Sequence, residues 1–264
     1  MPPRAVWSLA TLVAAAPAQA GPECKRDCEP VVQDVFGCCP ATPTSTGRVG
    51  SPPDRGVPVV AFEGPAGQAL LGMKVEVTQA LYQAVTGHAP SANGACGASC
   101  PVERVSWCDA TAFANRLSAR DWLRPAYRFP DGFRPGLDPA ACDLAAGAVI
   151  LDPGANGWRL PTETEWEALA SLDEPSVPEP PGGPARRVDG RPRPVCDGRE
   201  ERQGACDAVG NVWEWTWDTD SQGARVVRGC SYRCTPGTAS AASRQVAAPG
   251  SRDEAIGFRL VRAR

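Results

Sequence analysis

The chain has 264 residues, of which 42% are hydrophobic, and its 27 basic and 30 acidic residues give a formal net charge of −3. Because the basic residues are scattered and form no stripe with interleaved aromatic residues, the composition argues against a nucleic-acid partner. The 27 glycines and 28 prolines make up about a fifth of the chain, below the share that marks low-complexity disorder. We therefore expect a loop-rich globular protein.

The first twenty residues have the features of an export signal. Arg4 precedes an apolar run over residues 5–16, and Ala18-Gln19-Ala20 has the small-x-small form of a cleavage site. The alternative interpretation is a disordered tail. The apolar run is shorter than the ~20 residues of a membrane-spanning helix, and no later segment is apolar enough to qualify. The sequence therefore predicts a signal peptide over residues 1–20 and no membrane span.

All 12 cysteines follow the predicted signal peptide, and an even number in an exported chain indicates disulfides. Eight of them are near neighbours that could close small loops: Cys24/Cys28, Cys96/Cys100, Cys196/Cys206 and Cys230/Cys234. The other four need more distant partners: Cys38, Cys39, Cys108 and Cys142. Zinc is the competing explanation, but the spacings contain no paired C-x-x-C knuckles and His88 is the only histidine.

Residues 21–57 form a Cys/Pro-rich stretch with few large apolar side chains. Such a segment buries too little surface to offset the entropy of ordering, so we expect a linker. The pattern changes at residue 57, where Val57–Phe62 is typical of a strand, and residues 58–264 suit one domain.

Three helices are predicted in this domain, each beginning after a hydroxyl residue that can cap it. The capping residues are Thr78, Ser106 and Thr162. The first helix runs through Val85 and ends at Gly87. In the other two, an acidic residue three positions after the cap, Asp109 or Glu165, completes a capping box.

The remaining segments are less regular. Residues 174–205 contain seven prolines and many charges, which indicates a long surface excursion. Strands are predicted over Arg225–Arg228 and over Ile256–Val261. Six tryptophans are expected to build the core rather than a ligand platform. They are Trp107, Trp158, Trp166, Trp213, Trp215 and Trp217.

Six sequence blocks follow one another between residues 71 and 262. They are Gly72–Gln79, Cys100–Trp107, Arg159–Glu163, Gly210–Trp215, Arg228–Tyr232 and Gly257–Arg259. In order and spacing, these blocks resemble those of the formylglycine-generating enzymes, also called sulfatase-modifying factors. The resemblance implies an α+β, loop-rich, C-type-lectin-like fold, which we expect to be stapled by disulfides.

The resemblance also implies a structural calcium ion beside the Trp-Glu-Trp motif. By position its ligands would be the side chains of Asp207 and Glu214 and the backbone carbonyls of Gly210 and Val212. Carboxylate and carbonyl oxygens are the ligands that calcium prefers. The alternative is that Asp207 and Glu214 are ordinary hydrogen-bonding loop residues.

The catalytic centre of the family would lie near the C-terminus. Its enzymes oxidise a cysteine of an unfolded sulfatase to formylglycine with dioxygen and a copper(I) ion, which two soft thiolates hold. The first thiolate corresponds to Cys234, three residues after Ser231, but the second position is Ala239. Cys230 replaces a glycine of the family's block and is the candidate substitute. Ser231 and Trp213 correspond to residues that border the oxygen and substrate pocket.

Since Ala239 stands where a thiolate is needed, we expect an exported, periplasmic or secreted, non-catalytic member that binds a protein or peptide through a calcium-stiffened body. The alternative is an active copper-dependent oxidase that uses Cys234 with Cys230, and copper is expected only in that case. A further hypothesis assigns partner binding to the Cys-rich leader and to residues 174–205.

Overall fold

The computed structural model describes residues 56–134, 139–172, 190–197, 204–235 and 238–264. The predicted signal peptide, nearly all of the predicted linker with its four cysteines, and most of the excursion over residues 174–205 lie outside the described residues. In the described part of the excursion, Val195 N–H donates to the Ser99 carbonyl and Arg193 N–H to the Asn211 side chain. This part of the excursion therefore lies against the domain.

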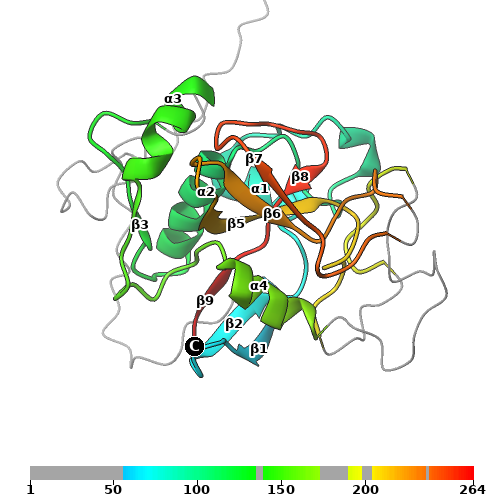
Figure 1. The fold of residues 1–264 in the computed structure, drawn as a ribbon, viewed down its shortest axis with the longest axis horizontal. Helices are drawn as coiled ribbons and strands as arrows, with labels where there is room; N and C mark the ends of the chain where they lie inside the picture. Colours follow the sequence, from blue (N-terminus) through cyan, green and yellow to red (C-terminus); the bar gives the residue numbers. More distant parts are fainter. Residues whose placement is uncertain (1–55, 135–138, 173–189, 198–203, 236–237) are drawn as a thin grey trace, which may run out of the picture.

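A four-stranded sheet forms the centre of the molecule (Figure 1). Its strands are β5 (Trp213–Thr219), β6 (Arg225–Arg228), β7 (Arg244–Ala247) and β8 (Ile256–Gly257), in the spatial order β7-β6-β5-β8. β6 is antiparallel to both β5 and β7, whereas β8 runs parallel to β5. The predicted strand over Arg225–Arg228 is confirmed, and β7 forms an edge of the sheet.

The second sheet contains the first and last strands of the described chain. It consists of β1 (Val59–Glu63), β2 (Ala69–Met73) and β9 (Val261–Ala263), with β2 in the middle and all pairs antiparallel. The strand predicted over Val57–Phe62 is confirmed as β1, shifted by one or two residues. A separate two-stranded ladder joins β3 (Tyr127–Arg128) to β4 (Ile150–Leu151).

The prediction of one closing strand over Ile256–Val261 is wrong. The segment divides into β8, which pairs with β5, and β9, which pairs with β2. Between them, the Phe258 and Leu260 carbonyls accept hydrogen bonds from the backbone of Val77 and Met73. The chain therefore changes hydrogen-bonding partners and connects the two larger sheets.

The three predicted helices are confirmed, and a fourth, unpredicted helix is present. The helices are α1 (Gln79–Thr86), α2 (Trp107–Arg120), α3 (Pro139–Ala145) and α4 (Glu163–Ala170), with short 3-10 turns at Gly94–Cys96 and Ala146–Ala148. The Thr78 hydroxyl accepts from Leu81 N–H, and both capping boxes form. Gly87 ends α1 at φ 77°, a left-handed conformation that suits glycine. α4 lies between the two larger sheets (Figure 1).

Tryptophan side chains dominate the core, as predicted. Five of the six are buried, four of them in the largest core cluster, and Trp217 is half-buried against that cluster. Two of the indole N–H groups find backbone partners: Trp107 donates to the Thr216 carbonyl and Trp215 to the Val105 carbonyl, each at 2.9 Å. Two others donate to carboxylates, Trp158 to Asp121 and Trp166 to Glu214. The large apolar rings can be buried because their single polar groups are hydrogen-bonded.

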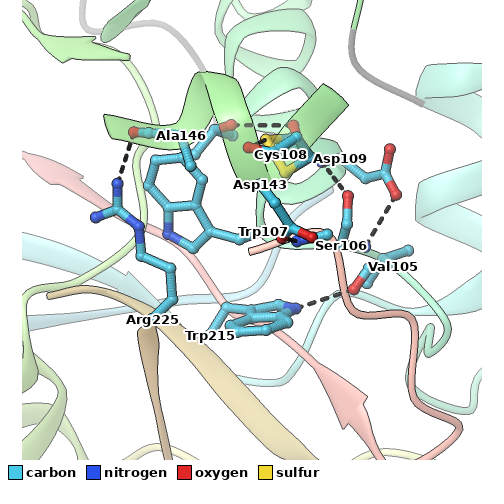
Figure 2. Close-up of a disulfide and its surroundings, with 12 residues drawn as sticks. Val105, Ser106, Trp107, Cys108, Asp109, Asp143, Ala146, Trp215 and Arg225 are labelled. Atoms are coloured by element: carbon cyan, nitrogen blue, oxygen red, sulfur yellow. Dashed lines mark hydrogen bonds between the residues drawn. A yellow bond between two sulfur atoms is a disulfide. The ribbon is translucent and has the colours of Figure 1, made fainter. Parts of the chain in front are cut away.

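Four disulfides join the eight cysteines that lie in the described residues. Three are the predicted short-range pairs, and the fourth, Cys108–Cys142, connects α2 to α3 (Figure 2). Arg225 reinforces this connection: it donates to the Ala146 carbonyl at 2.8 Å and lies 3.7 Å from the centre of the Trp107 ring. Burial lowers the pKa of Arg225 to about 10.

The number of disulfides is typical of proteins from an oxidising compartment. In the part of the chain that the structure describes, no helix has the length and apolar character needed to cross a bilayer.

Candidate functional site

The Trp-Glu-Trp motif begins β5 and places Glu214 in the interior. Arg259, in the segment between β8 and β9, donates to both carboxylate oxygens of Glu214, at 2.6 and 2.7 Å. Trp166 of α4 donates its indole N–H to the same carboxylate at 2.7 Å. Glu214 and Arg259 are each 1% exposed. This buried ion pair therefore links the central sheet, α4 and the C-terminal segment.

Two further buried carboxylates, Glu76 and Asp207, lie beside this ion pair. One oxygen of Glu76 accepts from the Asn211 side chain at 3.0 Å, but the other has no hydrogen-bond partner among the described residues. Burial and then the charge of Asp207 raise the pKa of Glu76 well above its usual range. Asp207 accepts from the Cys196 N–H. Asp207, Gly210 and Asn211 all have positive φ, so this loop is tightly bent.

The predicted calcium ligands occupy this region. A buried carboxylate oxygen without a partner, next to a second carboxylate, is a group that a divalent cation would satisfy. The unpaired Glu76 oxygen beside Asp207 thus suits a cation, whereas Arg259 and Trp166 already engage both oxygens of the predicted ligand Glu214. Within the described ranges no three His, Cys, Asp or Glu side chains form a metal-binding group, so an ion here would need the carbonyls.

The predicted catalytic residues come together around a surface cavity of about 580 Å³. Its wall carries both charges, several hydroxyls and one indole. The lining residues are Trp213, Cys230, Ser231, Arg233, Cys234, Thr235, Thr238, Ser243, Arg244, Gln245, Asp253, Ala255 and Ile256. Trp213 comes from β5 and Ile256 from β8, while the cysteines follow β6. The four predicted catalytic residues, Trp213, Cys230, Ser231 and Cys234, thus share one cavity.

Cys230 and Cys234 form a disulfide in the wall of this cavity. A tight turn holds them, because Cys234 N–H donates to the Ser231 carbonyl at 3.0 Å. The Ser231 N–H in turn points at the Cys234 sulfur, 3.3 Å away. Cys230 itself has φ 70°, a left-handed conformation that is uncommon for a side chain other than glycine. Gly229, immediately before it, is required because a Cβ there would lie 2.4 Å from the Ala208 carbonyl oxygen.

The position that the resemblance assigns to the second thiolate carries an apolar side chain. Ala239 is 1% exposed and belongs to the same core cluster as Cys230 and Trp213. Copper(I) needs two thiolates, and here one is replaced by a methyl group while Cys230 and Cys234 are bonded to each other. The residues present therefore do not fit the family's copper ion.

For several residues that shape the site, the sequence predicted no role. Glu76 and Arg259 stand inside recognisable sequence blocks, but their pairing with Asn211 and Glu214 depends on contacts between distant segments. The one available signal was a single arginine in the otherwise apolar segment Gly257–Val261. Arg233 was also missed; it pairs with Asp253 at 3.2 Å and with Glu254 at 2.9 Å at the rim of the cavity.

Comparison with known sequences gives two findings. Residues 67–175 and 181–264 match the family model described as the sulfatase-modifying factor enzyme 1-like domain. The chaperone protein LppX of Paenibacillus barcinonensis is 32% identical over 174 residues, which cover 56% of this chain and 61% of LppX. The chain thus spans less than two thirds of that relative.

Solved structures give the same fold. Treponema denticola variable protein 1 is 29% identical with a TM-score of 0.61, and the match covers 74% of this chain and 85% of that one. CarF is 26% identical with a TM-score of 0.60, over 79% and 98% of the two chains. PvdO from Pseudomonas aeruginosa, at 17% identity and a TM-score of 0.54 over 78% and 92%, shows the fold alone. The predicted α+β, loop-rich, disulfide-stapled fold is confirmed.

Proposed function

The chain belongs to the sulfatase-modifying factor enzyme 1-like family, and from this premise we propose that it is an exported, non-catalytic member that binds a protein or peptide partner. The binding site is the cavity beside the Cys230–Cys234 disulfide. The observation that carries this proposal is the buried Ala239. Because no thiolate can form there, the copper-dependent oxidation of the family has lost one of its two metal ligands.

The cavity retains what a binding site needs. Its volume lies within the range of about 300–1,000 Å³ typical of ligand sites. Trp213 provides an apolar surface, while Arg233 and the surrounding hydroxyls can hydrogen-bond to peptide groups. Arg244 and Gln245 of the edge strand β7 also line the cavity, so an extended partner segment can pair along β7 by strand addition.

A protein partner is also supported by the relative LppX, whose name describes it as a chaperone. Chaperones bind other polypeptides, which present extended segments with free backbone hydrogen-bonding groups. The polar, open character of the cavity wall suits such a segment.

Arginine substitution tests the binding site. Extended peptides would be selected on the purified protein and their affinity measured by fluorescence polarisation. Arg233→Ala should weaken binding by roughly 5- to 30-fold, as loss of an arginine anchor does in other interfaces. It should leave stability nearly unchanged, because Arg233 and its partners are half-exposed.

The matched control is Arg128→Ala, which removes an exposed arginine of β3 that does not line the cavity. If Arg128→Ala weakens binding as much as Arg233→Ala, or if neither does, the cavity is not the binding site.

The oxidase alternative requires a separate experiment. The purified protein would be incubated with copper(I) and a Cys-x-Pro-x-Arg peptide, and the mass of the peptide would be followed. We expect no aldehyde product from the native protein, because the two cysteines that line the cavity, Cys230 and Cys234, are joined in a disulfide. Formation of formylglycine would refute the non-catalytic assignment.

Calcium is proposed as the structural ion at Asp207, Glu76 and the carbonyls of Gly210 and Val212. An ion that binds only the folded protein stabilises it by about 2.7 kcal/mol at a hundred times its dissociation constant. Thermal unfolding should therefore shift upward with added calcium in the native protein and not in Asp207→Ala. An equal shift in both proteins would exclude this site.

A further inference from the structure

The Cys230–Cys234 disulfide differs in its surroundings from the disulfide that joins α2 to α3. Cys108 and Cys142 are both buried in the core, at 0% and 2% exposed. Cys234 is partly exposed, and both Cys230 and Cys234 line the cavity. A molecule in the cavity can therefore approach the Cys230–Cys234 bond.

The backbone around this disulfide is strained. Cys230 adopts φ 70°, and only glycine takes this conformation without steric cost. Backbone strain of this kind concentrates at functional sites. Strained or exposed disulfides are also more readily reduced than relaxed, buried ones.

The turn also treats the two sulfur atoms differently. The Ser231 N–H points at the sulfur of Cys234, and a hydrogen bond from a backbone amide favours the thiolate over the thiol. Cys230 is 5% exposed and lies in the core cluster with Ala239. After reduction, Cys234 would thus be the accessible thiolate and Cys230 the buried thiol behind it.

We propose that Cys230–Cys234 is an exchangeable disulfide that oxidises a pair of thiols in a polypeptide held in the cavity. A thiolate of that polypeptide attacks the sulfur of Cys234, the bond to Cys230 breaks, and Cys230 leaves as a thiolate that takes up a proton. The second thiolate of the polypeptide then attacks the polypeptide's first sulfur atom in the mixed disulfide, and Cys234 leaves as a thiolate that takes up a proton.

The balance of this exchange is complete without another reactant. The polypeptide loses two electrons and two protons and gains a disulfide, while Cys230 and Cys234 become thiols. A low-molecular-weight disulfide such as glutathione disulfide restores the starting form. The inference rests on the proposed function only for the location of the bound polypeptide.

The first test uses the native protein and glutathione alone. The protein would be equilibrated at increasing ratios of reduced to oxidised glutathione, alkylated, and analysed by mass spectrometry at each cysteine pair. We expect Cys230–Cys234 to open at a [GSH]²/[GSSG] ratio at least about tenfold lower than Cys108–Cys142. If both pairs open at the same ratio, the disulfide is purely structural and the proposal fails.

The second test separates the two sulfurs. Cys230→Ser leaves the accessible Cys234, and we expect it to form a mixed disulfide with glutathione at least about tenfold faster than Cys234→Ser, which leaves the buried Cys230. Circular dichroism would verify that both variants fold. Equal rates, or a faster reaction at Cys230, would overturn the assigned roles.

Neither measurement needs a polypeptide partner. If the Cys230–Cys234 disulfide does not exchange with glutathione, the proposal of peptide binding is unaffected. If it exchanges but no peptide binds, the proposed peptide-binding site is refuted and the exchangeable disulfide is not.

Discussion

Breaking the buried pair between Glu214 and Arg259 should destabilise the protein more than any exposed ion pair. In Arg259→Met the aliphatic volume is largely kept, but the Glu214 carboxylate loses both bonds from the guanidinium and keeps only the Trp166 indole. The carbonyls of Lys74 and Cys206 lose a donor as well.

The magnitude follows from burial. Removing one partner of a buried ion pair leaves an uncompensated charge and costs about 3–5 kcal/mol. For a protein of this size that corresponds to a lowering of the melting temperature by roughly 6–20 °C. Glu214→Gln should also destabilise, by about 2–4 kcal/mol, because it places an amide opposite the guanidinium donors. The double variant should cost less than the sum of both, since neither charge is then left alone.

The assay is urea unfolding followed by circular dichroism, with the disulfides intact and with a chelator present so that no metal contributes. Arg233→Met is the matched control, and its exposed pairs with Asp253 and Glu254 should contribute less than about 1 kcal/mol. If the costs of the two buried substitutions add to within about 0.5 kcal/mol, the direct pairing of Glu214 with Arg259 is refuted.

Three further predictions concern stability. Glu165→Gln should cost about 2 kcal/mol at neutral pH. Burial opposes ionisation of Glu165, but hydrogen bonds from Arg159 outweigh it and lower its pKa, so the difference from the native protein should shrink below about pH 4 in a pH series of urea titrations. Replacing Cys108 and Cys142 together by alanine should cost about 4 kcal/mol, because the bond closes a long loop; a loss below about 1 kcal/mol in guanidinium unfolding would contradict this. Gly229→Ala should cost roughly 2–4 kcal/mol, since its Cβ would meet a backbone oxygen at φ 91°; calorimetry showing an unchanged melting temperature would disprove the close approach.

Features encoded by neighbouring residues could be predicted from the sequence. The capping boxes of α2 and α4 depend on residues three positions apart, so both helix starts were correct. The short-range disulfides followed from spacing in the same way. α3 was missed although the sequence carries a start signal for it, Asp138 followed by Pro139 at the first helical position. β7 was missed because it has an exposed polar sequence without alternation.

Features that depend on distant contacts could not be predicted. The disulfide between Cys108 and Cys142 depends on the contact between α2 and α3. The division of the C-terminal segment into β8 and β9 depends on the free edges of β5 and β2, with which these strands pair. For the candidate site, the local cluster around Cys234 was visible in the sequence. The contact between Asn211 and Glu76 spans 135 positions, and no local pattern indicates it.

The connection of both larger sheets by the last residues has a consequence for the order of folding. A chain is synthesised from its N-terminus, so β8 and β9 are made after every other described strand. All eight paired cysteines of the described residues precede position 235. Their disulfides can therefore form before Arg259 is available to pair with Glu214. A chain without its final segment could still form these disulfides, but it would lack the strands that connect its two larger sheets.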